Sequence, residues 1–130
     1  MSHRPIIAAN SVVPLINSVS TASNITGPAT IIQFLPGISY EVSWTGTTNG
    51  TISVQVSNSF RQNADGTIAN AGNWTTLPTS SFSGTYPVPS GSPGSGMLDV
   101  VGTECYAVRL VYTRTGGSGT FTAIPCAKVL

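Results

Sequence analysis

Few side chains of this protein are suited to catalysis. The single histidine, His3, lies at the N-terminus, whereas a histidine-based triad or a multi-histidine metal site needs imidazoles that the fold holds in place. A pair of carboxylates is all that glycoside hydrolysis requires, and the acidic residues are Glu41, Asp65, Asp99 and Glu104. Asp65 precedes a glycine as in a turn, and the others are expected on a hydroxyl-rich strand face or beside solvated loops. We therefore predict no enzymatic activity, no cofactor and no metal site.

Aromatic and arginine side chains are better suited to binding, because these residue types dominate the energetics of protein interfaces. Exposed rings also stack on sugars in carbohydrate-binding sandwiches, so sugar binding is the alternative interpretation of the aromatics in predicted loops. We favour protein contact. The candidate partner-contact residues are Arg4, Ile6, Ile7, Phe60, Arg61, Trp74, Phe82 and Tyr86.

The two cysteines, Cys105 and Cys126, fall in the last two predicted strands. A turn near Gly116 would pair those strands in a register that offsets the cysteines by roughly 10 Å along the strand. That offset is too large for a disulfide without a bulge. We therefore expect two free thiols that act as small core residues.

Charge is scarce along the whole sequence. Charged residues make up 7% of the chain and the net charge is +1, against roughly 25% charged residues in ordinary domains. Hydroxyls and amides must then form most of the surface, and these groups are buried at a contact far more easily than an unpaired charge. This composition favours a protein that assembles with neighbours, and it offers no basic patch for nucleic acid or anionic lipid. We expect no nucleic-acid and no membrane partner.

The chain starts without the apolar core of a secretory signal, and no stretch approaches the ~20 apolar residues of a membrane span. We therefore expect synthesis in a cytoplasm. Turn residues recur every 8 to 12 positions and no segment keeps a helical apolar period, which is typical of an all-β sandwich or barrel. We predict a single-domain antiparallel β-sandwich, jelly-roll-like, with eight or nine strands. Residues 1–28 form an N-terminal arm or an edge strand in this prediction, and residues 29–130 form the sandwich domain.

Two hairpins are predicted within the sandwich. The first joins a strand over 38–46 to one over 51–57 through a three-residue loop at 48–50, which sets Trp44 opposite Val54. The second joins strands over 105–114 and 120–129. Further strands are expected over 30–35, 73–77 and 97–101, with a long exposed loop over 78–96. Tyr40 and Trp44 are predicted to lie in the core.

Three segments, in this order, resemble small virion proteins of tailed bacteriophages: Ile52-Ser53-Val54-Gln55-Val56-Ser57-Asn58, then Trp74-Thr75-Thr76-Leu77, then Tyr106-Ala107-Val108-Arg109-Leu110-Val111-Tyr112-Thr113-Arg114-Thr115-Gly116-Gly117-Ser118-Gly119-Thr120. The resemblance spans about residues 38–124. It implies a capsid decoration (cement) protein made in the host cytoplasm, which sits on the capsid exterior and clamps adjacent subunits of the major capsid protein. We also expect self-association as a dimer or trimer.

A shorter likeness around Val108-Arg109-Leu110 points to the arginine-bearing strand of discoidin-type sugar-binding sandwiches. Small β-proteins related to the phage group also serve in necks, tails and fibres. The alternative function is therefore a β-sandwich module of a neck, tail or fibre that binds host-receptor carbohydrate.

Overall fold

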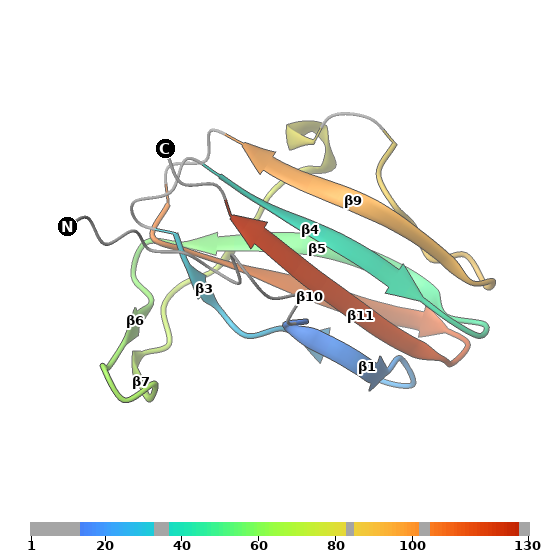
Figure 1. Ribbon diagram of the computed structural model, residues 1–130, viewed down its shortest axis with the longest axis horizontal. Coiled ribbons are helices and arrows are strands. Elements are labelled where there is room, and N and C mark those ends of the chain that lie inside the picture. Colours follow the sequence, from blue (N-terminus) through green and yellow to red (C-terminus); the bar gives the residue numbers. More distant parts are fainter. Residues whose placement is uncertain (1–13, 33–36, 83–84, 102–104, 128–130) are drawn as a thin grey trace.

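The computed structural model describes residues 14–32, 37–82, 85–101 and 105–127 (Figure 1). Arg4, Ile6 and Ile7 lie outside these ranges. The described residues form one short 3-10 helix, η1 (Thr79–Ser81), and eleven strands: β1 (Ile16–Ser20), β2 (Ile25–Thr26), β3 (Thr30–Ile31), β4 (Gly37–Trp44), β5 (Asn49–Ser57), β6 (Arg61–Gln62), β7 (Ile68–Asn70), β8 (Thr75–Thr76), β9 (Gly94–Val101), β10 (Ala107–Gly116) and β11 (Thr120–Ala127).

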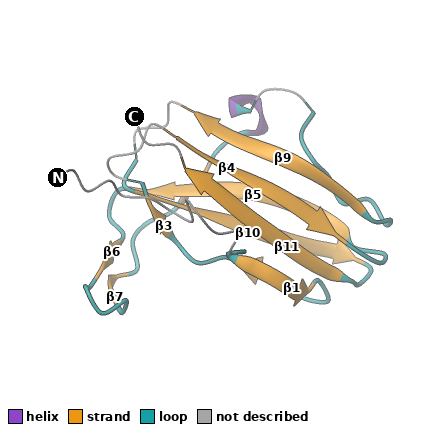
Figure 2. Cartoon of the chain, viewed as in Figure 1, coloured by secondary structure: helices purple, strands orange, loops and turns teal. Residues whose placement is uncertain are grey.

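The strands build two antiparallel sheets that pack face to face (Figure 2). The first sheet has the order β1-β11-β4-β9, and the second has the order β2-β10-β5-β8, with β3 also paired to β10. Taken as one interrupted strand, β2 and β3 leave eight main strands, of which the first pairs with the last, the second with the seventh, the third with the sixth and the fourth with the fifth. This nested pairing is that of a jelly roll. The predicted fold class is confirmed.

The first part of the chain contributes to both sheets. β1 pairs with β11 at one edge of the first sheet, and β2 pairs with β10 at one edge of the second. The β6–β7 hairpin forms a small sheet of its own and projects from one end of the sandwich (Figure 1). Its turn contains Asp65 and Gly66, as predicted, and Gly66 has a φ of 92°.

Both predicted hairpins are wrong. β4 pairs with β9 and β11, whereas β5 pairs with β8 and β10, so Trp44 lies opposite Phe121 and Gly94 rather than opposite Val54. β10 and β11 likewise belong to different sheets. Alternation of buried and exposed residues identifies the core face of a strand, but it does not identify the strand's partner. Each of these short connections crosses from one sheet to the other.

The cysteine prediction is confirmed in one respect and wrong in the other. Cys105 and Cys126 are free thiols, as expected. They are not core residues, because Cys105 is half-buried and Cys126 is exposed. The register argument does not apply, since the two strands it paired lie in separate sheets.

The core lies between the inward faces of the two sheets. Its largest fully buried side chains include Tyr40 from the first sheet and Tyr112 from the second. Tyr112 stacks across the core on Phe121 of β11, with ring centroids 5.6 Å apart and an interplanar angle of 26°. Trp44 is 6% exposed, and the predicted core positions of Tyr40 and Trp44 are confirmed.

At one end of the sandwich, two turns hold the sheets together. We call this feature the clasp, and it consists of residues 45–48, between β4 and β5, and residues 117–120, which lead into β11 (right-hand end in Figure 1). The Thr47 N–H donates to the Ser118 carbonyl at 2.8 Å, and the Ser118 N–H donates to Thr47 Oγ1 at 3.0 Å. Thr45 and Thr120 are joined in the same way by backbone and hydroxyl groups. The clasp itself contains no charged residue, and one neighbouring charge supports it, since Arg114 Nε donates to the Gly117 carbonyl at 3.1 Å.

A buried hydroxyl pair extends the clasp toward β1. Thr21 and Thr48 are both 0% exposed, and their Oγ1 atoms lie 2.7 Å apart. Thr48 Oγ1 also lies 2.8 Å from the Thr45 carbonyl, to which it can donate. Buried hydroxyls that are satisfied in this way stabilise one arrangement of the turns over others.

The loop between η1 and β9 closes one side of the sandwich. The Tyr86 hydroxyl donates to the Ile52 carbonyl at 2.6 Å, and Pro87 lies against the inner face of Gly96 on β9. The prediction of a wholly exposed loop is wrong here, because Pro87 and Pro89 are buried. The loop between η1 and β9 has to cross from one sheet to the other, and its apolar residues pack against the core where it crosses.

The buried hydroxyl of Tyr40 gives a test of the core. It has no partner of hydrogen-bond geometry among the described residues, whereas the Tyr112 hydroxyl donates to the Asn49 carbonyl at 3.0 Å. Leaving a buried polar group unpaired costs about 1–3 kcal/mol, and a paired one contributes roughly 1 kcal/mol. We expect Tyr40→Phe to raise the free energy of unfolding by about 1 kcal/mol and Tyr112→Phe to lower it by about the same amount in chemical denaturation. A loss of stability in both variants would contradict this account.

Tyr40→Phe should also change how the free energy of unfolding depends on pH in alkaline solution. Burial raises the pKa of Tyr40 well above its ordinary value, and the nearby Thr30 hydroxyl offsets only part of that effect. The folded state therefore favours the neutral phenol of Tyr40. The stability that this preference provides is fully present below the unfolded pKa of 10.0 and is lost as the pH rises above that value. Each pH unit removes up to about 1.4 kcal/mol. Tyr40→Phe should therefore lose stability less steeply above pH 10.

Candidate partner-contact site

Two arginines and three aromatic rings form a continuous group on the second sheet and the adjoining β6–β7 hairpin. We call it the Arg–aromatic cluster, and its members are Phe60, Arg61, Trp74, Tyr106 and Arg109. Strand alternation positions Arg109, because Val108 and Leu110 on either side are buried and turn inward. The Arg109 side chain therefore lies on the outer face of β10.

Arg109 is fixed by two contacts on that face. Its guanidinium carbon lies 4.2 Å from the centroid of the Trp74 ring, and its Nε donates to Gln55 Oε1 at 2.8 Å. Gln55 is the residue directly opposite on β5, and its amide donates in turn to Thr76 Oγ1 at 3.3 Å. Partial burial lowers the pKa of Arg109 from its ordinary value, but a guanidinium remains charged at neutral pH. The stack therefore presents an oriented positive charge.

Arg61 makes a second stack of the same kind. Its guanidinium carbon lies 4.2 Å from the centroid of the Tyr106 ring, and its Nη1 donates to the carbonyls of Asn58 and Phe60 at 2.8 and 2.7 Å. The Tyr106 N–H donates to Asn58 Oδ1 at 2.9 Å. The ring of Phe60 lies 5.5 Å from that of Trp74. The two stacks are thus joined through Phe60.

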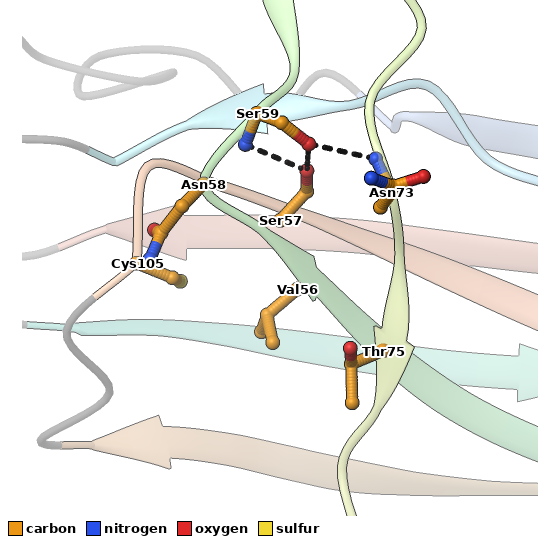
Figure 3. Close-up of a pocket in the computed structure, with 7 residues that line it drawn as sticks. All are labelled: Val56, Ser57, Asn58, Ser59, Asn73, Thr75 and Cys105. Atoms are coloured by element: carbon orange, nitrogen blue, oxygen red, sulfur yellow. Dashed lines mark hydrogen bonds between the residues drawn. The ribbon is translucent and has the colours of Figure 1, made fainter.

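A shallow hollow lies beside the cluster, between the chain leaving β5 and the chain entering β8 (Figure 3). It has a volume of about 480 Å³ and is lined by Val56, Ser57, Asn58, Ser59, Asn73, Thr75 and Cys105. Ser59 Oγ accepts a hydrogen bond from the Asn73 N–H at 2.8 Å and lies 3.4 Å from Ser57 Oγ. Ser57 Oγ also accepts from the N–H groups of Ser59 and Phe60. The hydroxyl oxygens of Ser57 and Ser59 thus accept hydrogen bonds from the backbone and stabilise the conformation of the loop.

The hollow offers hydrogen bonds rather than a reactive group. Burial raises the pKa of the Cys105 thiol, which disfavours the thiolate that nucleophilic attack requires. Within the part of the chain that the structure describes, no group of three or more His, Cys, Asp or Glu side chains lies close enough to hold a metal ion. In the same residues, no helix is long and apolar enough to cross a membrane.

No family model, curated protein or solved structure matches this protein. The resemblance to phage virion proteins therefore rests on the three sequence segments, and the fold rests on the strand topology. A jelly roll serves many functions, so function has to be argued from the surface.

The structure brings three of the predicted contact residues together. Arg61 is exposed, Trp74 is half-buried, and Phe60 is only 4% exposed. The Phe60 ring therefore packs against Trp74 on the side away from solvent. This buried position corrects the prediction of Phe60 as a surface contact. Phe82 and Tyr86 form a separate edge-to-face pair, 5.3 Å between centroids, that packs partly against the core.

Two members of the cluster were not among the predicted contact residues. Tyr106 and Arg109 appear in the sequence analysis only within the segments that carry the family likenesses. The available signal was the position of Arg109, a charged residue that faces outward between Val108 and Leu110 in a chain with few charges. The partnership with Trp74 depends on the pairing of β8 with β5, and a prediction of strands one by one does not supply that pairing.

The contacts of Trp74 and Tyr86 bear on the carbohydrate alternative. One face of the Trp74 ring is covered by Arg109, and the indole N–H donates to the Ala71 carbonyl at 2.8 Å. The Tyr86 hydroxyl donates a hydrogen bond to the Ile52 carbonyl. Sugar stacking needs a ring face that is free, and Arg109 already covers one face of Trp74.

Proposed function

We propose that the protein is a non-enzymatic virion structural protein, a capsid decoration protein that binds and stabilises the shell of the major capsid protein. The jelly-roll topology, the scarcity of charge and the resemblance of residues 38–124 to phage virion proteins support this proposal. The Arg–aromatic cluster is its docking site. The protein acts mechanically, because each copy bridges neighbouring shell subunits.

The observation that carries the proposal is the pair of stacked arginines, Arg109 on the second sheet and Arg61 in the adjoining β6–β7 hairpin, on a surface formed mainly of hydroxyl and amide groups. Stacking and hydrogen bonding hold each guanidinium before a partner arrives, so less side-chain entropy is lost on docking. The N–H groups of the guanidinium that remain free suit carbonyl or carboxylate oxygens of a protein partner. Arginine and tryptophan are also the residue types most enriched in interface hot spots.

Repetition multiplies such contacts. A lattice offers the same subunit surface many times, so a protein that engages two or more sites gains avidity without a strong single contact. A surface of hydroxyls and amides can be buried at each contact without the desolvation penalty of unpaired charges. The shell then opens only if many of these contacts break together.

Quantitative mass spectrometry of virions of the encoding phage tests the location. Hundreds of copies in fixed ratio to the major capsid protein would support the decoration role. A dozen copies or fewer would place the protein in the neck, tail or fibre and would favour the carbohydrate alternative. Absence from the particle would overturn the proposal.

Arg109→Met tests the docking site on undecorated shells. We expect binding to weaken at least tenfold, because truncation of an interface hot spot costs about 2 kcal/mol or more. Arg114→Met is the control for loss of charge, since Arg114 is exposed and lies outside the cluster, where its Nε donates only to Gly117 of the clasp at 3.1 Å. An equal loss in both variants would mean that overall charge, rather than the cluster, governs docking. Denaturation curves of both variants verify that the fold is retained.

A further inference from the structure

The edges of the two sheets differ greatly in length and regularity. β9 pairs with β4 over all eight of its positions, from Gly94 to Val101, without a shift in register. At the opposite edge of the same sheet, β1 has five residues, a register shift, and a left-handed residue, Ser18, with a φ of 51°. The outer strands of the second sheet, β2, β3 and β8, have two residues each. β9 is thus the longest regular edge among the described residues.

Within residues 14–32, 37–82, 85–101 and 105–127, no strand pairs with the outer edge of β9. Natural sheets guard an edge with charged side chains, prolines, bulges or a covering segment, and of these β9 has a single charge, Asp99, with no proline and no bulge. Between described residues, the backbone hydrogen bonds outside the strand ladders do not involve residues 94–101. The loop before β9 reaches this strand on the inner side of the sheet, where Gly96 faces Pro87. No described residue therefore occupies the backbone groups along the outer edge of β9.

The side chains of β9 suit pairing with a second copy of itself. Met97 stands on the outer face in the middle of the strand and is 58% exposed. If two β9 strands run antiparallel with Met97 opposite Met97, Ser95 lies opposite Asp99, so that no like charges meet. On the inner face, Gly96 lies opposite Leu98 and Gly94 opposite Val100. These inner-face positions add no contact between the copies, because Leu98 and Val100 are already buried and the inner sides of Gly94 and Gly96 face Trp44 and Pro87.

We propose that two copies of the protein pair through the outer edges of β9 around a two-fold axis at Met97. The two four-stranded sheets β1-β11-β4-β9 then join into one eight-stranded sheet. Such an interface is isologous, because the same surface is used by both copies. Its affinity comes from backbone hydrogen bonds and from the two methionines that cover one another. The inference goes beyond the proposed function, since the dimer forms without a capsid.

Met97→Lys tests the pairing, because it places two lysines opposite each other at the axis. In sedimentation velocity over a concentration series, we expect a reversible dimer of the natural protein and a dissociation constant at least tenfold higher for the variant. Ser43→Lys is the matched control, since Ser43 is exposed on the same outer face but belongs to β4 inside the sheet. A monomer at all concentrations, or a dimer that Met97→Lys leaves intact, would overturn the proposal.

A cysteine pair tests the register. In a Cys105→Ser/Cys126→Ser background, Met97→Cys should form a disulfide-linked dimer under mild oxidation, because directly opposite Cβ atoms approach to about 4.5 Å, the upper end of the range that a disulfide spans. Ser95→Cys in the same background should not, since its cross-strand neighbour is Asp99. Cross-linking through Ser95→Cys alone would overturn this register. Hydrogen exchange is the last check: protection on dimerisation that appears in residues 1–13 but not in β9 would assign the contact to the N-terminal segment and overturn the proposal.

Discussion

Alanine at position 117 is expected to lower the free energy of unfolding by about 3 kcal/mol or more. Gly117 has a φ of 67°, a conformation that costs an L-residue roughly 1–2 kcal/mol. A Cβ at this position would also overlap the carbonyl oxygen of Thr47. Relieving that overlap separates the two halves of the clasp and weakens the Thr47–Ser118 hydrogen bonds, which contribute roughly 1 kcal/mol each. Guanidinium denaturation, with the slope checked for two-state behaviour, measures the loss.

Two other glycines separate the causes of this loss. Gly66 also has a positive φ, 92°, but a Cβ there meets nothing within 4 Å, so Gly66→Ala should lose only about 1 kcal/mol. A Cβ at Gly116 also meets nothing within 4 Å and its φ is not positive, so Gly116→Ala should change stability by less than about 0.5 kcal/mol. If Gly117→Ala behaved like Gly66→Ala, the clasp would contribute little to stability.

Phe121→Ala should remove about 3–5 kcal/mol, the usual loss for a large buried aromatic residue. Phe121 is 0% exposed and stacks on Tyr112 of the opposite sheet. A domain of this size has a total stability of about 5–15 kcal/mol, so the variant should unfold at a much lower denaturant concentration. Ile124→Ala on the outer face of the same strand is the control. Ile124 is half-buried, and its loss should stay near 1 kcal/mol.

A double-mutant cycle of Tyr112→Ala and Phe121→Ala tests the contact between the sheets. Stacked aromatic pairs contribute about 0.5–1.5 kcal/mol beyond the area that they bury. The two losses should therefore fail to add by about 1 kcal/mol. Strict additivity would mean that the two rings do not depend on one another.

The fold class could be predicted from local patterns, because alternation of period two and regularly spaced turns depend only on neighbouring residues. Tyr40, Val42 and Trp44 alternate with exposed or half-buried partners, and this alternation identified them as core. The same local patterns could not specify strand pairing. A jelly roll pairs strands that are far apart in the sequence, and Ser18 contacts Thr122 across 104 residues.

The Arg–aromatic cluster was predictable in part for the same reason. Residue type and loop position singled out Arg61 and Trp74, which the structure brings together through Phe60. Phe60 was misjudged because a buried aromatic residue beneath a loop has the same local sequence as an exposed one. Arg109 joins Trp74 only because β8 adds to the edge of β5, and no local pattern contains that arrangement.

The position of β11 has a consequence for biosynthesis. This strand is the last of the described strands in the chain, yet it lies inside the first sheet, between β1 and β4. Until it leaves the ribosome, β1 has no partner in its sheet and one side of β4 is open. Loop closure over such distances is slow, and open strand edges recruit other chains. A nascent or truncated chain that lacks β11 is therefore the species most exposed to aggregation.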